Sequence, residues 1–192
     1  MQLAIANVLS AEEAAEVRAA LANVRFLDGR ATAGFAAREV KDNRQADSLD
    51  RNVKTIQQTT GDRIAANELF ALAARPKQIT PVVFSKYEPG MRYGSHVDDA
   101  LMRGMRSDVS FTLFLSPMES YEGGELVIET ASGEDAIKLE AGYMVVYPAT
   151  TLHRVNEVTR GERLAAVGWV RSFIRDAAKR ELLFDLDTAR KR

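Results

Sequence analysis

From residue 79 onward the chain is a series of short β-prone segments separated by turn signals, and this pattern limits the possible folds most strongly. Residues 107–115 (SDVSFTLFL) alternate apolar and polar side chains, as in a strand with one face in a core. Further β-prone segments follow at residues 125–129, 143–147 and 163–172, with glycine-containing turns between them. Many short strands at regular intervals are typical of a sandwich or a barrel. We therefore expect an α+β protein with a mainly β core.

The first third of the chain differs, because its apolar residues recur at helical spacing. Ser10 and Glu13 form a capping-box pattern at the start of the first helix. Residues 47–75 have the same periodicity, and we expect Gly61 to divide them into two helices, the second of which ends at Pro76. This third is therefore predicted to be mostly helical.

Residues 28–45 are rich in Gly, Ala and charge, and we expect a loop with one short strand near residues 36–40. Such a loop is either a surface connection or the rim of an active site, and the sequence allows both. The whole chain is predicted to be one domain. Its expected parts are a helical support region (1–76), a β core (79–172) and a C-terminal helix (173–192), which together span residues 1–192.

The composition excludes several kinds of protein. A net charge of −1, with acids and bases mixed along the chain, argues against a nucleic-acid partner or a polybasic membrane patch. The chain has no cysteine, which removes thiol catalysis, disulfides and cysteine-based zinc sites. Neither a secretory signal nor an apolar run near the roughly 20 residues that span a bilayer is visible, so we expect a cytoplasmic protein.

His96 and His153 are the only histidines of the chain, and both lie in strand-like segments. Residues two apart in an extended backbone point to the same face, so His96 and Asp98 would present an imidazole and a carboxylate side by side. A His-x-Asp triplet alone arises by chance in about one such chain in ten, and is weak evidence. Together with His153, however, it would complete the 2-His-1-carboxylate triad that holds non-haem Fe(II).

Three protein ligands on one side of Fe(II) leave open positions for a 2-oxoacid co-substrate and O₂. The far carboxylate of such a co-substrate would need a cation. Arg163, ten residues past His153, is the candidate, because a guanidinium can meet a carboxylate with two hydrogen bonds. Taken alone, Arg163 would be an ordinary solvated residue at the start of a strand. Tyr87 could add a phenolic hydrogen bond to the same carboxylate, although a half-buried packing role is equally compatible with its position.

The chain resembles the PKHD-type hydroxylases, bacterial relatives of the catalytic domain of the prolyl 4-hydroxylase α-subunit. The resemblance covers nearly the whole chain. It rests on the segments DGRATAG, VKDNRQ, YEPGMRYGSHVDDALM, RSDVSFTLFLS, YEGGELVI, IKLEAGYMVVYPATTLHRVNEVTRGERLAAVGWVRS and RELLFDLD.

This resemblance implies a double-stranded β-helix (jelly-roll) with helices packed outside. It implies that His96, Asp98 and His153 hold Fe(II) and that Arg163 anchors 2-oxoglutarate. The implied reaction hydroxylates a C–H bond of a small-molecule or peptidyl substrate with O₂, while 2-oxoglutarate is converted to succinate and CO₂ and ascorbate serves as reductant. Family members typically extend past the FDLD segment, so a further C-terminal element is expected, and a homo-oligomer is one open possibility.

Two other functions use the same ligands. A cupin-like module could bind a metal or a small anion as a sensor without catalysis, but it would have no need of Arg163. A zinc hydrolase could also use two histidines and a carboxylate, yet no general base is evident beside them. The identity of the substrate does not follow from the fold.

Overall fold

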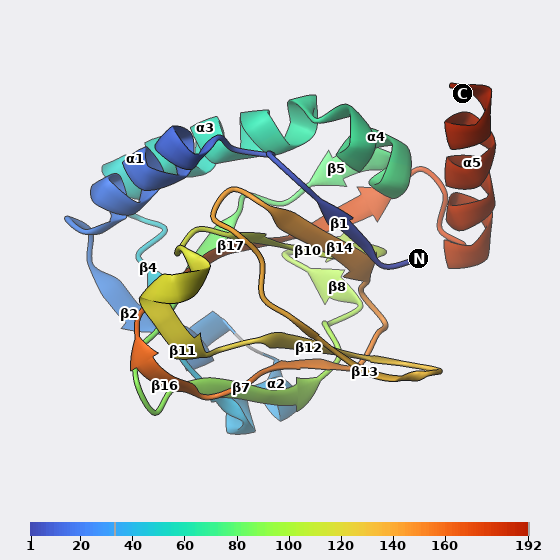
Figure 1. The fold of residues 1–192 in the computed structure, drawn as a ribbon. Helices are drawn as coiled ribbons and strands as arrows, with labels where there is room; N and C mark the ends of the chain where they lie inside the picture. The colour runs from blue at the N-terminus through green and yellow to red at the C-terminus, as the bar shows by residue number, and fades with distance from the viewer. Residues whose placement is uncertain (33, 192) are drawn as a thin grey trace.

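The computed structural model describes residues 1–32 and 34–191, which form two antiparallel sheets with helices packed outside (Figure 1). Within these residues the larger sheet has eight strands. In spatial order they are β1 (Leu3–Ile5), β14 (Met144–Pro148), β10 (Val109–Phe114), β17 (Arg163–Ser172), β6 (Val83–Tyr87), β4 (Arg44–Ala46) and β2 (Phe26–Asp28), with β5 (Pro76–Ile79) paired to β17.

The smaller sheet has five strands among the described residues. Their order is β13 (Gly133–Ile137), β12 (Leu126–Thr130), β15 (His153–Val155), β7 (Arg92–His96) and β3 (Lys41–Asp42). Two short pairs complete the β structure, β11 (Tyr121–Gly123) with β16 (Val158–Gly161) and β8 (Leu101–Met102) with β9 (Met105–Arg106). The expected mainly β core is confirmed.

Three helices cover the outer face of the larger sheet, and one stands beside it (Figure 1). The covering helices are α1 (Ala11–Leu21), α3 (Arg51–Ala66) and α4 (Glu68–Ala74). Helix α5 (Ala177–Arg190) packs beside α4, where Arg75 forms an ion pair with Asp187. The remaining helical pieces are α2 (Phe35–Glu39), η1 (Gly29–Thr32) and η2 (Met118–Ser120). No helix in the described part of the chain is long and apolar enough to cross a membrane.

Strand β10 connects the two layers, because all its residues are buried but its two faces differ. Val109, Phe111 and Leu113 join the core under the helices, where the Phe111 ring meets that of Phe70 edge-on at 5.7 Å. The opposite face carries Phe114, which belongs to the apolar cluster between the sheets. The predicted alternation is therefore confirmed, with the polar positions of β10 turned toward the space between the sheets.

Two expectations for the helices have different outcomes. The capping box at Ser10 and Glu13 is present at the start of α1. The break at Gly61 is wrong, because α3 runs through this position and ends at Asn67 instead. Asn67 leaves the helical region with ψ 116° and its Oδ1 accepts the Phe70 amide, so it caps the start of α4. A specific cap therefore outweighs the modest helix-breaking tendency of one glycine.

The strand expected near residues 36–40 is also wrong, because these residues lie mainly in α2. The sequence FAARE consists largely of good helix formers, and this outweighs the β preference of Val40 just beyond it. The first 76 residues are not helical support alone, since β1, β2, β3 and β4 each join a sheet. This places the segment around β3 and β4 next to the strands that carry the histidines.

Candidate metal centre and active-site cavity

The two histidines lie directly opposite each other in the smaller sheet. Strands β7 and β15 pair with His96 in register with His153, and the two ring centroids are 4.3 Å apart. One antiparallel strand pair therefore brings together two histidines that are far apart in the sequence.

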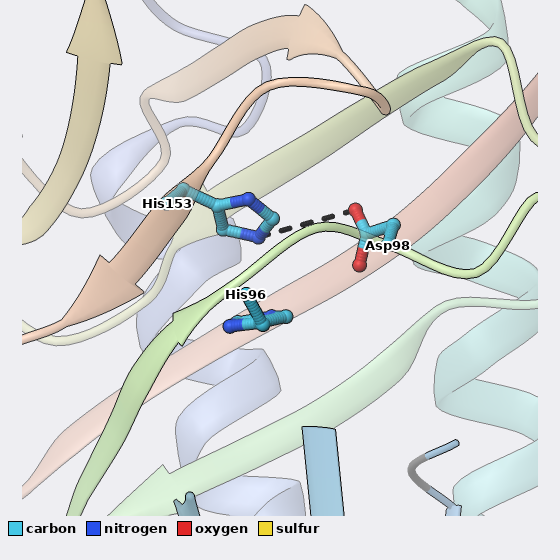
Figure 2. Close-up of side chains that lie close together, drawn as sticks. All are labelled: His96, Asp98 and His153. Carbon is cyan, nitrogen blue, oxygen red and sulfur yellow. Dashed lines mark ion pairs between the residues drawn. The ribbon is translucent and has the colours of Figure 1, made fainter. Parts of the chain in front are cut away.

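Asp98 completes the group from just outside the strand. Strand β7 ends at His96, and the exposed Val97 separates it from Asp98. The Asp98 Oδ2 atom lies 3.9 Å from His153 Nε2, and the three side chains surround a common space (Figure 2). The Ser110 hydroxyl donates to the same Oδ2. Because Ser110 lies on β10, this hydrogen bond ties the carboxylate to the larger sheet.

Backbone carbonyls orient both imidazoles. His96 Nδ1 lies 2.8 Å from the Gly94 carbonyl oxygen, and His153 Nδ1 lies 2.9 Å from that of Thr151. A carbonyl only accepts, so each Nδ1 carries a proton and each Nε2 is the ring nitrogen left for a metal ion. Outer hydrogen bonds of this kind orient histidine ligands in metal sites.

The donor set fits one divalent metal ion. One ligand atom from each of His96, Asp98 and His153 lies within 4.8 Å of the others. Two imidazoles and one carboxylate, with room left on one side, are the ligands typical of non-haem Fe(II) oxygenases. Burial, followed by the neighbouring charge of His153, lowers the pKa of His96 to about 4. This imidazole is therefore neutral near pH 7, as metal binding requires.

Two tyrosines pack against the histidines. Tyr93 stacks on His96 with ring centroids 3.6 Å apart, and Tyr147 meets His153 edge-on at 5.0 Å. Burial raises the pKa of both phenols, so they remain neutral. These rings hold the imidazoles in place without adding charge.

Arg163 is almost completely buried, with 1% of its surface exposed. Its Nε and Nη2 atoms have no hydrogen-bond partner within the described residues. Arg163 lies opposite Tyr87 in the β17–β6 pairing, with its guanidinium carbon 5.2 Å from the Tyr87 ring centroid and 5.3 Å from that of Phe114. A buried guanidinium with free donors fits a carboxylate ligand, because the unpaired group would otherwise be strongly unfavourable.

Gly124 leaves space beside this arginine. Its φ is +67°, and a Cβ there would lie 2.9 Å from Arg163 Cδ. A larger residue would be strained and would press on the arginine stem. The backbone at this turn therefore contributes to the position of the guanidinium.

A cavity of about 520 Å³ joins the histidines and Asp98 to Arg163 and Tyr87. Residues of the 28–45 segment form part of its wall, which favours the rim interpretation of that segment over a plain surface connection. Sequence reasoning missed Ser110, Lys41 and Asn43, which also line the cavity. The polar face of β10 could have indicated Ser110 as a cavity residue, whereas no sequence signal indicated Lys41 or Asn43.

Comparisons with known proteins agree with this geometry. Residues 82–171 match the model of the 2OG-Fe(II) oxygenase superfamily. The chain is 50% identical to a PKHD-type hydroxylase of Picosynechococcus sp. over 97% of its length and 85% of the relative. It is 52% identical to a PKHD-type hydroxylase of Crocosphaera subtropica, over 100% of the chain and 87% of the relative.

The fold is similar to the crystal structure of a Pseudomonas putida prolyl-4-hydroxylase, with a TM-score of 0.62 and 22% identity over 89% of this chain and 92% of that one. At this identity the likeness shows the fold alone, and the predicted jelly-roll is thereby confirmed. The sequence relatives show more. The chain belongs to the PKHD-type hydroxylases of the 2OG-Fe(II) oxygenase superfamily, and it is an Fe(II)- and 2-oxoglutarate-dependent dioxygenase.

Proposed function

We propose that His96, Asp98 and His153 are the Fe(II) ligands of this dioxygenase. The convergence of one ligand atom from each of these three side chains at the cavity wall is the observation that carries this assignment. Bound Fe(II) would supply the O₂ chemistry that couples 2-oxoglutarate oxidation to substrate hydroxylation. In the overall reaction one oxygen atom of O₂ enters succinate and the other enters the product hydroxyl, while CO₂ is released.

We propose further that Arg163 binds the far carboxylate of 2-oxoglutarate. Its two unpartnered donors support this role, because a carboxylate would satisfy both of them at once. Tyr87, its neighbour across the strand pair, is 3% exposed and neutral, since burial raises the pKa of its phenol. Its hydroxyl would add one more donor to the same carboxylate.

The remaining histidine contacts serve orientation. The Gly94 and Thr151 carbonyls keep each Nε2 turned toward the centre, and Ser110 fixes one oxygen of Asp98. A preoriented ligand set binds metal more tightly, because less side-chain freedom is lost on binding.

Ascorbate as reductant, a cytoplasmic location, a homo-oligomer and the absence of a nucleic-acid partner remain predictions of the sequence and its resemblance. The substrate is proposed to be a small molecule or a peptidyl group. A prolyl ring is one option, because the structurally similar protein from Pseudomonas putida is a prolyl-4-hydroxylase.

The alternative of a non-catalytic metal or anion module has less support. Such a module could use the same three ligands, but it gives no reason for a buried arginine with free donors beside them. The zinc hydrolase lacks support for the same reason.

The test is anaerobic titration with Fe(II) and 2-oxoglutarate, followed by exposure to O₂. We expect a metal-to-ligand charge-transfer band that requires both components, and succinate formation after O₂ is admitted. His96→Ala should abolish the band, and Arg163→Met should shift its 2-oxoglutarate dependence to much higher concentration. A full band and full turnover in His96→Ala would contradict the ligand assignment.

A further inference from the structure

Lys41 is a buried cation to which the proposed reaction assigns no role. It lies on β3, opposite Tyr93 of β7, and only 5% of its surface is exposed. Its ammonium donates to the Thr32 hydroxyl at 3.2 Å and lies 5.0 Å from the Tyr93 ring centroid. No carboxylate oxygen of the described residues lies within 4.0 Å of this ammonium, the longest distance of an ion pair.

A buried ammonium without a paired carboxylate is unfavourable for folding. Burial lowers the pKa of Lys41 to about 8, although the charges of Asp98 and Asp28 act in the opposite direction. The lysine therefore remains largely protonated near pH 7 although it is buried and has no paired carboxylate among the described residues. Side chains that weaken the fold in this way are concentrated at functional sites.

Lys41 and Arg163 approach the same cavity from different sheets. Lys41 extends from the edge of the smaller sheet, and Arg163 from the middle of the larger one. The co-substrate has two carboxylates, which the proposed function places at the metal and at Arg163. The Lys41 ammonium is then left as a second cation, available to another anionic group near the metal ligands.

The next residues along the chain add a second observation. Lys41, Asn43 and Gln45 are buried, whereas Asp42 and Arg44 between them are exposed. All three buried residues line the cavity. Neither amide atom of Asn43 has a partner at full hydrogen-bond geometry in the described part of the chain, although the amide interacts with the Tyr87 phenol. Gln45 accepts from the same Thr32 hydroxyl that Lys41 donates to, which fixes the position of this polar row. A buried amide in a cavity wall without a well-formed hydrogen bond leaves capacity to bind a polar ligand.

We propose that Lys41 binds a carboxylate of the primary substrate, so that the molecule hydroxylated by this enzyme is an organic acid rather than a neutral or cationic compound. This inference rests on the proposed function. The polar row of Lys41, Asn43 and Gln45 is the wall that orients this acid beside the metal centre. Lys41 is thus a substrate-positioning residue.

The first measurement needs no substrate. We expect Lys41→Met to melt at or above the temperature of the wild-type protein, because it removes an unpaired buried charge. Lys86→Met is the matched control, since Lys86 is also partly buried but lies 3.2 Å from Glu88 and 3.4 Å from Glu162. The control should not gain stability. A clear fall in the Tm of Lys41→Met alone would show a structural lysine and overturn the proposal.

The second measurement uses the anaerobic protein loaded with Fe(II) and 2-oxoglutarate. The probes are N-acetyl-proline, N-acetyl-leucine and N-acetyl-lysine, each as the free carboxylate and as the primary carboxamide, and binding is followed through the charge-transfer band. We expect at least one carboxylate to bind more tightly than its carboxamide. Its affinity should fall about tenfold or more in Lys41→Met, recover partly in Lys41→Arg, and stay unchanged in Lys86→Met.

Three outcomes would overturn the proposal: carboxamides that bind as well as the acids, no acid that binds at all, or an equal loss of 2-oxoglutarate affinity in Lys41→Met. The last outcome would assign Lys41 to the co-substrate. Failure of the proposed function is recognised separately, because the wild-type protein would then give no charge-transfer band and no succinate. In that case the Tm comparison still shows whether the fold needs Lys41.

Discussion

Arg163 lies directly opposite Tyr87 in the pairing of β17 with β6, and its guanidinium carbon is 5.2 Å from the Tyr87 ring centroid. The arginine is thereby held against an aromatic face while two of its nitrogens have no partner within the described residues. Its stem and its charge are stabilised by packing, and these two nitrogens remain available to a ligand.

Replacement of Arg163 should therefore act on the co-substrate first. We expect Arg163→Met to raise the KM for 2-oxoglutarate about 100-fold or more, because a buried, desolvated ion pair would be lost. Steady-state succinate formation measures this change. Arg160→Met is the control, since Arg160 is an exposed residue whose ion pair with Glu122 lies at the surface. Equal effects of the two variants would argue against a specific carboxylate site.

Ser110→Ala should weaken metal binding without changing the ligands themselves. The variant loses the hydroxyl that donates to Asp98 Oδ2, so the carboxylate is free to rotate. We expect the Fe(II) concentration for half-maximal turnover to rise about 10- to 100-fold. Ser132→Ala, at an exposed residue of the β12–β13 turn that does not line the cavity, should leave this concentration unchanged. Unaltered iron dependence in Ser110→Ala would show that Asp98 is fixed by other contacts.

Two glycine variants separate backbone strain from crowding of Arg163. Gly124 and Gly104 have φ values of +67° and +76°. A Cβ at Gly124 would contact Arg163 and Val158, whereas a Cβ at Gly104 would contact no atom of the described residues within 4 Å. Alanine should destabilise the protein at both positions by about 1 kcal/mol or more. Only Gly124→Ala should also raise the KM for 2-oxoglutarate. A similar KM in both variants would mean that the guanidinium tolerates the added methyl group.

The metal-free protein should become less stable as the pH falls from about 6.5 toward 4. Burial lowers the pKa of His96 to about 4 from the ordinary value of 6.5, so the unfolded chain binds the proton first in this window. The contribution of His96 is complete above pH 6.5 and is lost as the pH falls, at up to about 1.4 kcal/mol per pH unit. Urea unfolding at pH 5, 6 and 7 measures it. His96→Asn should show a smaller slope, and an unchanged slope would assign the effect to other groups.

Gly61→Ala should stabilise the protein. The position lies inside α3, and a Cβ there meets no atom within 4 Å. Alanine is favoured over glycine in a helix interior by about 0.5–1 kcal/mol, so we expect a higher free energy of unfolding in urea. A decrease would indicate that the helix needs a flexible residue at its centre.

The sequence predicts the convergence of the three candidate metal ligands well, because it follows simple geometric rules. The spacing of His96 and Asp98 and the presence of one other histidine leave few alternatives, and the alternation in β10 predicts the two buried faces. The helix break could not be placed correctly, because the cap formed by Asn67 depends on where its side chain turns. The role of Ser110 and the burial of Lys41 could not be predicted either, since both depend on which strands of different sheets lie across the cavity.

The three candidate metal ligands extend from the smaller sheet and from the segment after β7, whereas Arg163, the proposed cation for the co-substrate, belongs to the larger sheet. An ion and a dicarboxylate bound together would therefore bridge the two halves of the sandwich, in the manner of a removable cross-link. Ligands that bind only the folded state add their binding free energy to its stability. Iron supply would thus affect how readily the protein unfolds and is degraded by proteases, as well as its catalytic rate.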